Sequence, residues 1–191
     1  ERSSAYTNIF ELLTCVLFCA GTILIVLNRI YITYFCEESY FVAWKITPIL
    51  MYSAILNCIS GLLGSNYLIM HDTKSALKVT AIGALINTLL NFLLVPIFGL
   101  YGAAIATVIG YLYMVIKKYF DTSKFTPLRI KMDRFILVNA LIIIMFFSAL
   151  IEKSLVYYSL NLLIAFFMGW LYKDQFIKVI TLIMNRFKKK V

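Results

Sequence analysis

The residues of this chain that could bind a polar ligand are few, and they stand inside long apolar segments. Two are basic and three are amides, namely Arg29, Lys45, Asn57, Asn87 and Asn91. A polar side chain in such a segment is costly to place against lipid, and it usually faces the interior of a helical bundle or a polar cavity. These five residues are therefore the candidate binding residues of the chain.

Each of these groups also has a purely structural explanation. The asparagines can tie neighbouring helices together, and Arg29 can reach the membrane interface or pair with Glu37 or Glu38. Whether the asparagines bind a ligand or join helices, their side chains should not face lipid, because an unpaired amide in hydrocarbon costs several kcal/mol. The sequence therefore predicts a bundle of helices that pack against one another.

The composition indicates an integral membrane protein. Hydrophobic residues make up 62% of the 191 positions, and the mean hydropathy is +0.90. Soluble domains are only about half apolar. The apolar runs have the length of helices, and no alternating apolar and polar strand pattern is present. We predict an all-α, polytopic transmembrane bundle of about six spans, over residues 9–34, 41–70, 79–96, 100–116, 135–151 and 155–172.

The hairpin 79–116 is built for contact between helices. Small residues recur at helical spacing on both of its arms, and we expect Gly83, Gly102, Ala106 and Gly110 to form the packing surface. Proline and glycine mark the turn between the arms, at Pro96 and Gly99. Before the hairpin, Asp72 or Thr73 is placed to cap the start of its first helix.

The positive charge is concentrated beside the spans. The net charge is +9, and most basic residues lie in the segments 117–134 and 173–190. This is the pattern of cytoplasmic loops that face anionic lipid, and it argues against nucleic-acid binding. We therefore expect membrane lipids as partners and both ends of the chain in the cytoplasm. The predicted organisation is four spans in 1–120, a basic linker at 121–134, a helical hairpin at 135–172 and an amphipathic basic tail at 173–191.

Catalytic patterns are missing from the sequence. It has no paired carboxylates, no Asp-x-Asp, no histidine cluster and no glycine-rich phosphate loop. The four cysteines have no histidine or carboxylate at the spacing of a zinc site. We expect neither an enzyme nor a metal or cofactor.

The hairpin and its lead-in resemble a known family of transporters. The resemblance is carried by GLLGSNYLIMHDTK at 61–74, by the helix that Lys78 leads with Asn87 and Asn91, and by LLVPIFGLYGAAIAT at 93–107. In combination these look like the second half of the lipid-linked oligosaccharide or O-antigen flippases of the multidrug/oligosaccharidyl-lipid/polysaccharide exporter superfamily. By motif and order the resemblance covers residues 9–120.

The resemblance implies that this chain holds the last spans of a MATE-like transporter of about fourteen helices. On this interpretation the chain is the C-terminal part of a longer protein, and the pair at 135–172 is an accessory hairpin. The chain starts with glutamate and carries no signal peptide, so we expect Glu1 to be an internal position.

The family's function is to move an undecaprenyl-pyrophosphate-linked oligosaccharide across the cytoplasmic membrane of a bacterium for surface polysaccharide export. The implied partners are this substrate and polysaccharide assembly proteins, and Arg29 and Lys45 would contact its phosphate or sugar. Three alternatives stay open. They are a multidrug exporter of the same superfamily, a membrane-embedded polysaccharide polymerase or glycosyltransferase, and a purely structural subunit.

Overall fold

The computed structural model describes residues 2–37, 43–125, 132–148, 154–175, 177 and 181. These residues form helices joined by turns, and none of the described residues forms a strand. The all-α part of the prediction is therefore confirmed. The helices are α1 (Arg2–Phe35), α2 (Ala43–Ile69), α3 (Thr73–Phe98), α4 (Leu100–Phe125), α5 (Met132–Ser148) and α6 (Ser154–Leu171).

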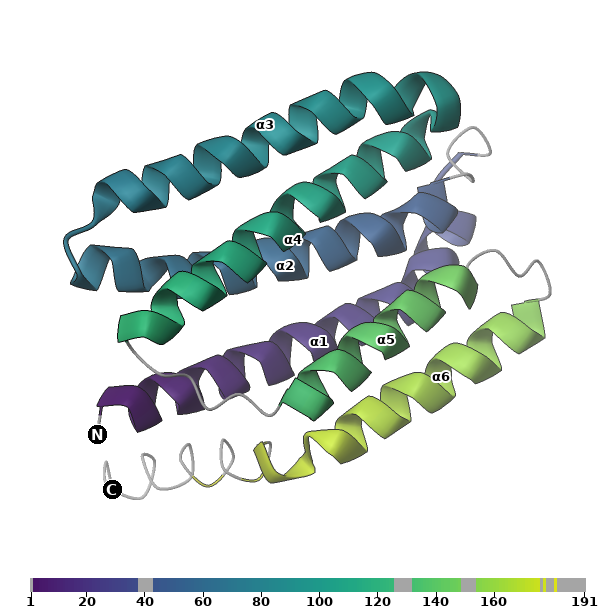
Figure 1. Ribbon diagram of the computed structural model, residues 1–191. Coiled ribbons are helices and arrows are strands. Elements are labelled where there is room, and N and C mark those ends of the chain that lie inside the picture. The colour runs from purple at the N-terminus through teal and green to yellow at the C-terminus, as the bar shows by residue number, and fades with distance from the viewer. Residues whose placement is uncertain are drawn as a thin grey trace.

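The helices lie side by side and alternate in direction along the chain (Figure 1). One end of the bundle carries the start of α1, the turn from α2 to α3, the end of α4, the start of α5 and the end of α6. The opposite end carries the other helix ends. Helix α4 packs between α2 and α3, while α1 contacts α2, α5 and α6.

Among the residues that the structure describes, four helices are long and apolar enough to cross a membrane. They are Tyr6–Phe35 in α1, Ala43–Ile69, Thr73–Phe98 and Leu100–Lys124 in α4. Helices α5 and α6 have 17 and 18 residues. At 1.5 Å per residue these reach about 26 and 27 Å, which is short of a hydrocarbon core of about 30 Å. The structure is thus compatible with a membrane protein, and the fifth and sixth spans stay predictions.

The range 121–134, which the sequence assigns to a linker, is helical at both of its ends. Helix α4 continues to Phe125 and α5 begins at Met132. Of the amphipathic tail expected at 173–191, only residues 173–175, 177 and 181 are described, and the rest of the prediction lies outside the described residues.

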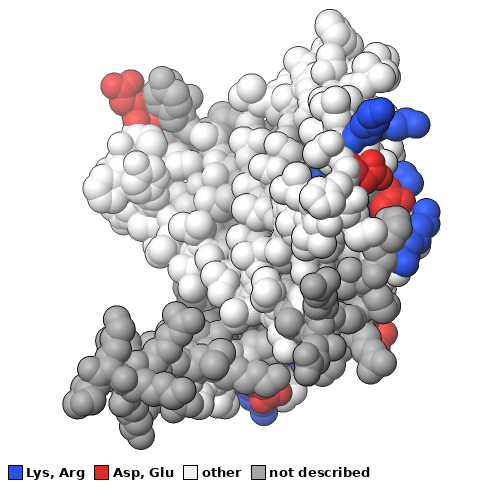
Figure 2. All heavy atoms as spheres, turned by 90° about the vertical axis from the view of Figure 1, so that its left-hand side faces the viewer, with Lys and Arg blue, Asp and Glu red and all other residues white. Residues whose placement is uncertain are grey.

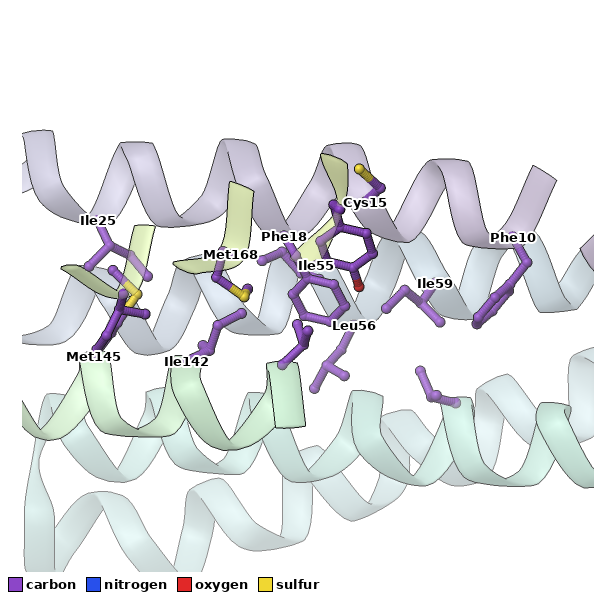
Figure 3. Close-up of a cluster of buried hydrophobic side chains, with 14 of the residues drawn as sticks. Phe10, Cys15, Phe18, Ile25, Ile55, Leu56, Ile59, Ile142, Met145 and Met168 are labelled. Carbon is purple, nitrogen blue, oxygen red and sulfur yellow. The ribbon is translucent and has the colours of Figure 1, made fainter. Parts of the chain in front are cut away.

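The largest core joins five helices, because Val115 of α4 lies in it beside residues of α1, α2, α5 and α6. Figure 3 shows apolar side chains of α1, α2, α5 and α6 directed into one interior, and Phe18, Ile59 and Met145 are fully buried there. Phe18 also meets Phe135 of α5 edge to face, with ring centroids 6.3 Å apart. Between apolar helices in lipid, such close packing is a main source of attraction, because lipid tails are as apolar as the side chains themselves.

Helices α3 and α4 approach each other through small residues. A Cβ atom at Gly83 would meet the side chain of Met114, and one at Gly110 would lie 3.1 Å from the carbonyl oxygen of Gly83. Helix α3 continues through Pro96, which the sequence predicts to lie in the turn, to Phe98. Gly99 caps it with a φ of 55°, a conformation that glycine adopts without strain. Helix α3 lies at the edge of the bundle, where it contacts α4 and, less extensively, α2. Only 6% of the residues in its most apolar stretch are buried.

The first turn of α3 is capped as the sequence predicts. The Asp72 carboxylate accepts a hydrogen bond from the backbone N–H of Ser75 at 3.1 Å. Hydrogen bonds from the Ser75 side chain and backbone lower the pKa of Asp72 below its usual value. The N-cap prediction is confirmed for Asp72.

Replacing Gly102 with alanine should destabilise the protein. The new Cβ would collide with the carbonyl oxygen of Leu94 and lie 2.9 Å from the backbone nitrogen of Val95, and backbone atoms cannot rotate away. We expect a loss of about 1–3 kcal/mol in thermal unfolding of the full-length protein in detergent. Gly169→Ala is the matched control, because its Cβ would meet no atom within 4 Å. Equal losses in the two variants would contradict the close helix contact.

Removing the Asp72 cap should weaken the protein in a pH-dependent way. Because the carboxyl pKa is lower in the folded than in the unfolded state, its contribution is complete above the usual carboxyl pKa. It is lost as the pH falls through the lowered value. Asp72→Ala should therefore lower the thermal midpoint at neutral pH, with a difference from the wild type that shrinks in acid. Asp72→Asn keeps a capping oxygen and should lose less at neutral pH.

Candidate functional site

Two of the five predicted binding residues meet around one indole ring. The guanidinium carbon of Arg29, on α1, lies 4.4 Å from the centroid of the Trp44 ring on α2. The ammonium nitrogen of Lys45 lies 5.5 Å from the same ring centroid. Both distances are in the range of cation–π attraction. We call Arg29, Lys45, Trp44 and Tyr157 the cation–aromatic cluster.

A third helix completes this cluster. Tyr157 of α6 lies with its ring centroid 5.2 Å from the guanidinium carbon of Arg29 and 5.9 Å from the Trp44 ring, edge to face. Its side chain is fully buried, and its hydroxyl donates a hydrogen bond to the carbonyl oxygen of Ile25 at 2.9 Å. The cluster therefore forms only when α1, α2 and α6 are packed together.

A buried amide fixes the indole-bearing segment. Asn28, on α1, is 6% exposed and donates a hydrogen bond to the carbonyl oxygen of Trp44 at 2.9 Å. Its neighbour Arg29 is half-buried, as is Lys45. Aromatic faces attract these cations electrostatically, and guanidinium and ammonium groups are donors that bind phosphate and carboxylate groups.

Asn57 lies on a different face of α2. It is exposed, and it follows Lys45 by twelve positions, or about 18 Å along the helix axis. Its exposed neighbours on that face are the small residues Ala54, Cys58 and Gly61. Asn57 is therefore separate from the cation–aromatic cluster.

Asn87 and Asn91 lie together on α3. The side-chain amide of Asn91 donates hydrogen bonds to the carbonyl oxygen of Asn87, at 3.0 Å, and to its side-chain oxygen. Both residues are half-buried, and Asn87 lines a hollow of about 250 Å³ between α3 and α4. The hydrogen bonds of Asn91 thus run within its own helix, where they turn the pair toward one another.

The predicted packing residues lie at the contact between α3 and α4 or beside it. Gly83, Gly102, Ala106 and Gly110 are all buried. Gly83 and Gly110 face each other across the two helices, while Gly102 lies against the backbone of α3 near the turn.

One buried cation lies where the sequence interpretation places a basic loop. Lys118 is 8% exposed, and its ammonium donates to the hydroxyl of Ser60 at 3.0 Å and to the Ser60 carbonyl oxygen at 3.3 Å. It lies on α4, which continues past residue 116. The sequence did contain a pattern that indicates this longer helix. The residues that share its buried face recur at helical spacing, and they are Ala104, Val115, Lys118 and Thr122.

Trp44 and Tyr157 were also missed, and no local pattern points to them. Their partners come from other helices, so only the packing of the bundle brings them to Arg29.

No protein-family model, curated protein or solved structure matches this chain. Its function must therefore be inferred from its own residues and their geometry.

The hydroxyl of Tyr157 should contribute measurably to the cluster. Tyr157→Phe leaves the carbonyl oxygen of Ile25 without this donor while it keeps the aromatic ring. We expect a loss of about 1–2 kcal/mol in the thermal unfolding of the full-length protein in detergent. Tyr158→Phe is the matched control, since Tyr158 is half-buried next to it and its hydroxyl makes no hydrogen bond with the described part of the chain. A larger loss for Tyr158→Phe would contradict the role of the hydroxyl.

Proposed function

We propose that this chain is the C-terminal part of a MATE-like flippase that moves undecaprenyl-pyrophosphate-linked oligosaccharide across the cytoplasmic membrane of a bacterium. The chain would supply helices of the second transporter lobe, and the rest of the protein would supply the first. The substrate's lipid tail would stay in the bilayer while its polar headgroup crosses.

The observation that carries the proposal is the cation–aromatic cluster. Arg29 and Lys45 come from two apolar helices and converge on Trp44, with Tyr157 on the other side of the guanidinium. A pyrophosphate linked to a sugar needs cationic donors for its phosphate oxygens and flat apolar surfaces for the sugar ring. Charged residues within apolar helices are rare and are commonly retained for function.

The exposed face of α2 supports the same proposal. Asn57, Cys58 and Gly61 form a small and polar surface on an apolar helix. An amide exposed to hydrocarbon would cost several kcal/mol, so this face needs another part of the protein or water against it. A polar passage between two lobes meets that requirement.

In this mechanism the cluster acts by binding and not by covalent chemistry. Arg29 and Lys45 would hold the pyrophosphate while the lobe changes its orientation, and Asn28 and Tyr157 would keep α1, α2 and α6 together as one body. Polar donors at Asn57, Asn87 and Asn91 would offer further hydrogen bonds to the glycan along its path.

The proposal is tested by complementation of a strain that lacks the complete gene. Deletion should abolish surface polysaccharide and leave lipid-linked repeat units on the cytoplasmic side. Arg29→Gln should restore the coat about ten- to hundredfold less efficiently than the wild type, because it removes a charge-assisted contact to phosphate. Arg134→Gln is the matched control, since Arg134 also lies over an aromatic ring, 5.6 Å from that of Tyr172.

Two outcomes would contradict the proposal. A deletion strain with an unaltered coat would exclude a role in polysaccharide export. Short unpolymerised glycan on the cell surface would point instead to a polymerase. Comparable protein levels of the two arginine variants in the membrane fraction are required for the comparison.

A further inference from the structure

A second polar region lies at the other end of the bundle, where α2 ends, α3 begins and α4 ends. A hollow of about 310 Å³ opens between these three helices. Figure 2 shows this end, with lysine and acidic side chains gathered along one edge of an otherwise largely uncharged described surface. We call this hollow the lysine groove. It is lined by Tyr67, Asp72, Ser75, Lys78, Val79, Ile82, Tyr113, Lys117, Asp121 and Lys124.

The charged side chains of the groove differ in whether they have a partner of opposite charge. Asp121 accepts the Tyr67 hydroxyl at 2.8 Å, pairs with Lys117 at 2.9 Å and lies 3.5 Å from Lys124. Lys78 comes from α3, and no carboxylate among the described residues lies within ion-pair distance of it. Three lysines against two carboxylates leave one net positive charge in the groove.

One wall of the groove is apolar and continues along the membrane span. Val79 and Ile82 line the groove, and Leu85 and Leu89 follow Ile82 on α3 at helical spacing, both exposed. An apolar track thus leads from the lysines onto the outer surface of a helix that is long and apolar enough to cross a membrane.

We propose that the lysine groove binds the phosphodiester headgroup of an anionic phospholipid, with its acyl chains along α3. Lys78 would donate to the phosphate oxygens together with Lys124, whose contact with Asp121 is the longer of the two lysine contacts. A soluble phosphate would use the lysines but not the track at Val79 and Ile82. A phospholipid uses both, and basic pockets between membrane helices are suited to anionic headgroups.

This binding is separate from the proposed transport substrate, whose cluster lies at the opposite end of the bundle (Figure 1). A lipid bridging α3 to α4 would also hold the peripheral helix α3 in place. The protein's stability would then depend on the anionic lipid content of the membrane.

The test uses the full-length protein in detergent, with lipid binding followed by native mass spectrometry and by the thermal midpoint. Phosphatidylglycerol should bind and raise the midpoint, while phosphatidylcholine should do neither. Lys78→Ala and Lys124→Ala should each weaken phosphatidylglycerol binding by about fivefold. Lys78→Arg should retain it. Lys74→Ala is the matched control, because Lys74 is exposed one turn away on α3 and does not line the groove.

Three results would overturn the proposal. Equal binding of phosphatidylcholine would exclude recognition of the anionic headgroup. Competition by inorganic phosphate as strong as that by phosphatidylglycerol would mean that the apolar track contributes nothing. A loss in Lys74→Ala equal to that in Lys78→Ala would indicate a diffuse surface attraction. Circular dichroism of each variant separates loss of binding from loss of folding. If the complementation test of the transport function fails, the lipid-binding result still stands, because the two measurements are independent.

Discussion

Several of the larger polar side chains in these apolar helices find their partners on a neighbouring helix, and these contacts constrain how the bundle is assembled. Tyr157 reaches a carbonyl of α1, Asn28 reaches a carbonyl of α2, and Lys118 reaches Ser60 across the contact between α4 and α2. Two further pairs repeat the pattern, from the Tyr6 hydroxyl to the carbonyl of Leu62 at 2.7 Å and from the Tyr52 hydroxyl to Asn139 at 2.6 Å.

The free energies of these hydrogen bonds indicate their role in the bundle. Hydrogen bonds between membrane helices average only about 0.6 kcal/mol each, whereas an unsatisfied polar group in hydrocarbon costs several kcal/mol. The apolar core of Phe18, Ile59 and Met145 therefore supplies attraction through close packing. The polar pairs select one register, because a displaced helix would leave them without partners.

This difference also explains how much could be predicted from the sequence. The two ends of α3 could be predicted, since the Asp72 cap and the Gly99 cap each depend on a few adjacent residues. The end of α4 was missed, because Lys117 and Lys118 look like a solvated loop unless the helical spacing of Lys118 from Val115 is noticed. The partners of Arg29 lie on two other helices, and no spacing within one segment could have identified Trp44 and Tyr157.

The outer surfaces of the helices divide by the size of their side chains. The exposed face of α1 carries large apolar residues such as Ile23, Leu24 and Leu27, which suit contact with acyl chains. The middle of the exposed face of α2 carries Asn57 and Gly61, with the exposed Leu50 and Leu68 on either side of them along the helix. The Asn57 amide makes no hydrogen bond with the described part of the chain. Lipid against both the α1 face and the α2 face would not explain why their side chains differ. In a bilayer the α1 face suits acyl chains, whereas the Asn57 amide on the α2 face needs protein or water as a partner.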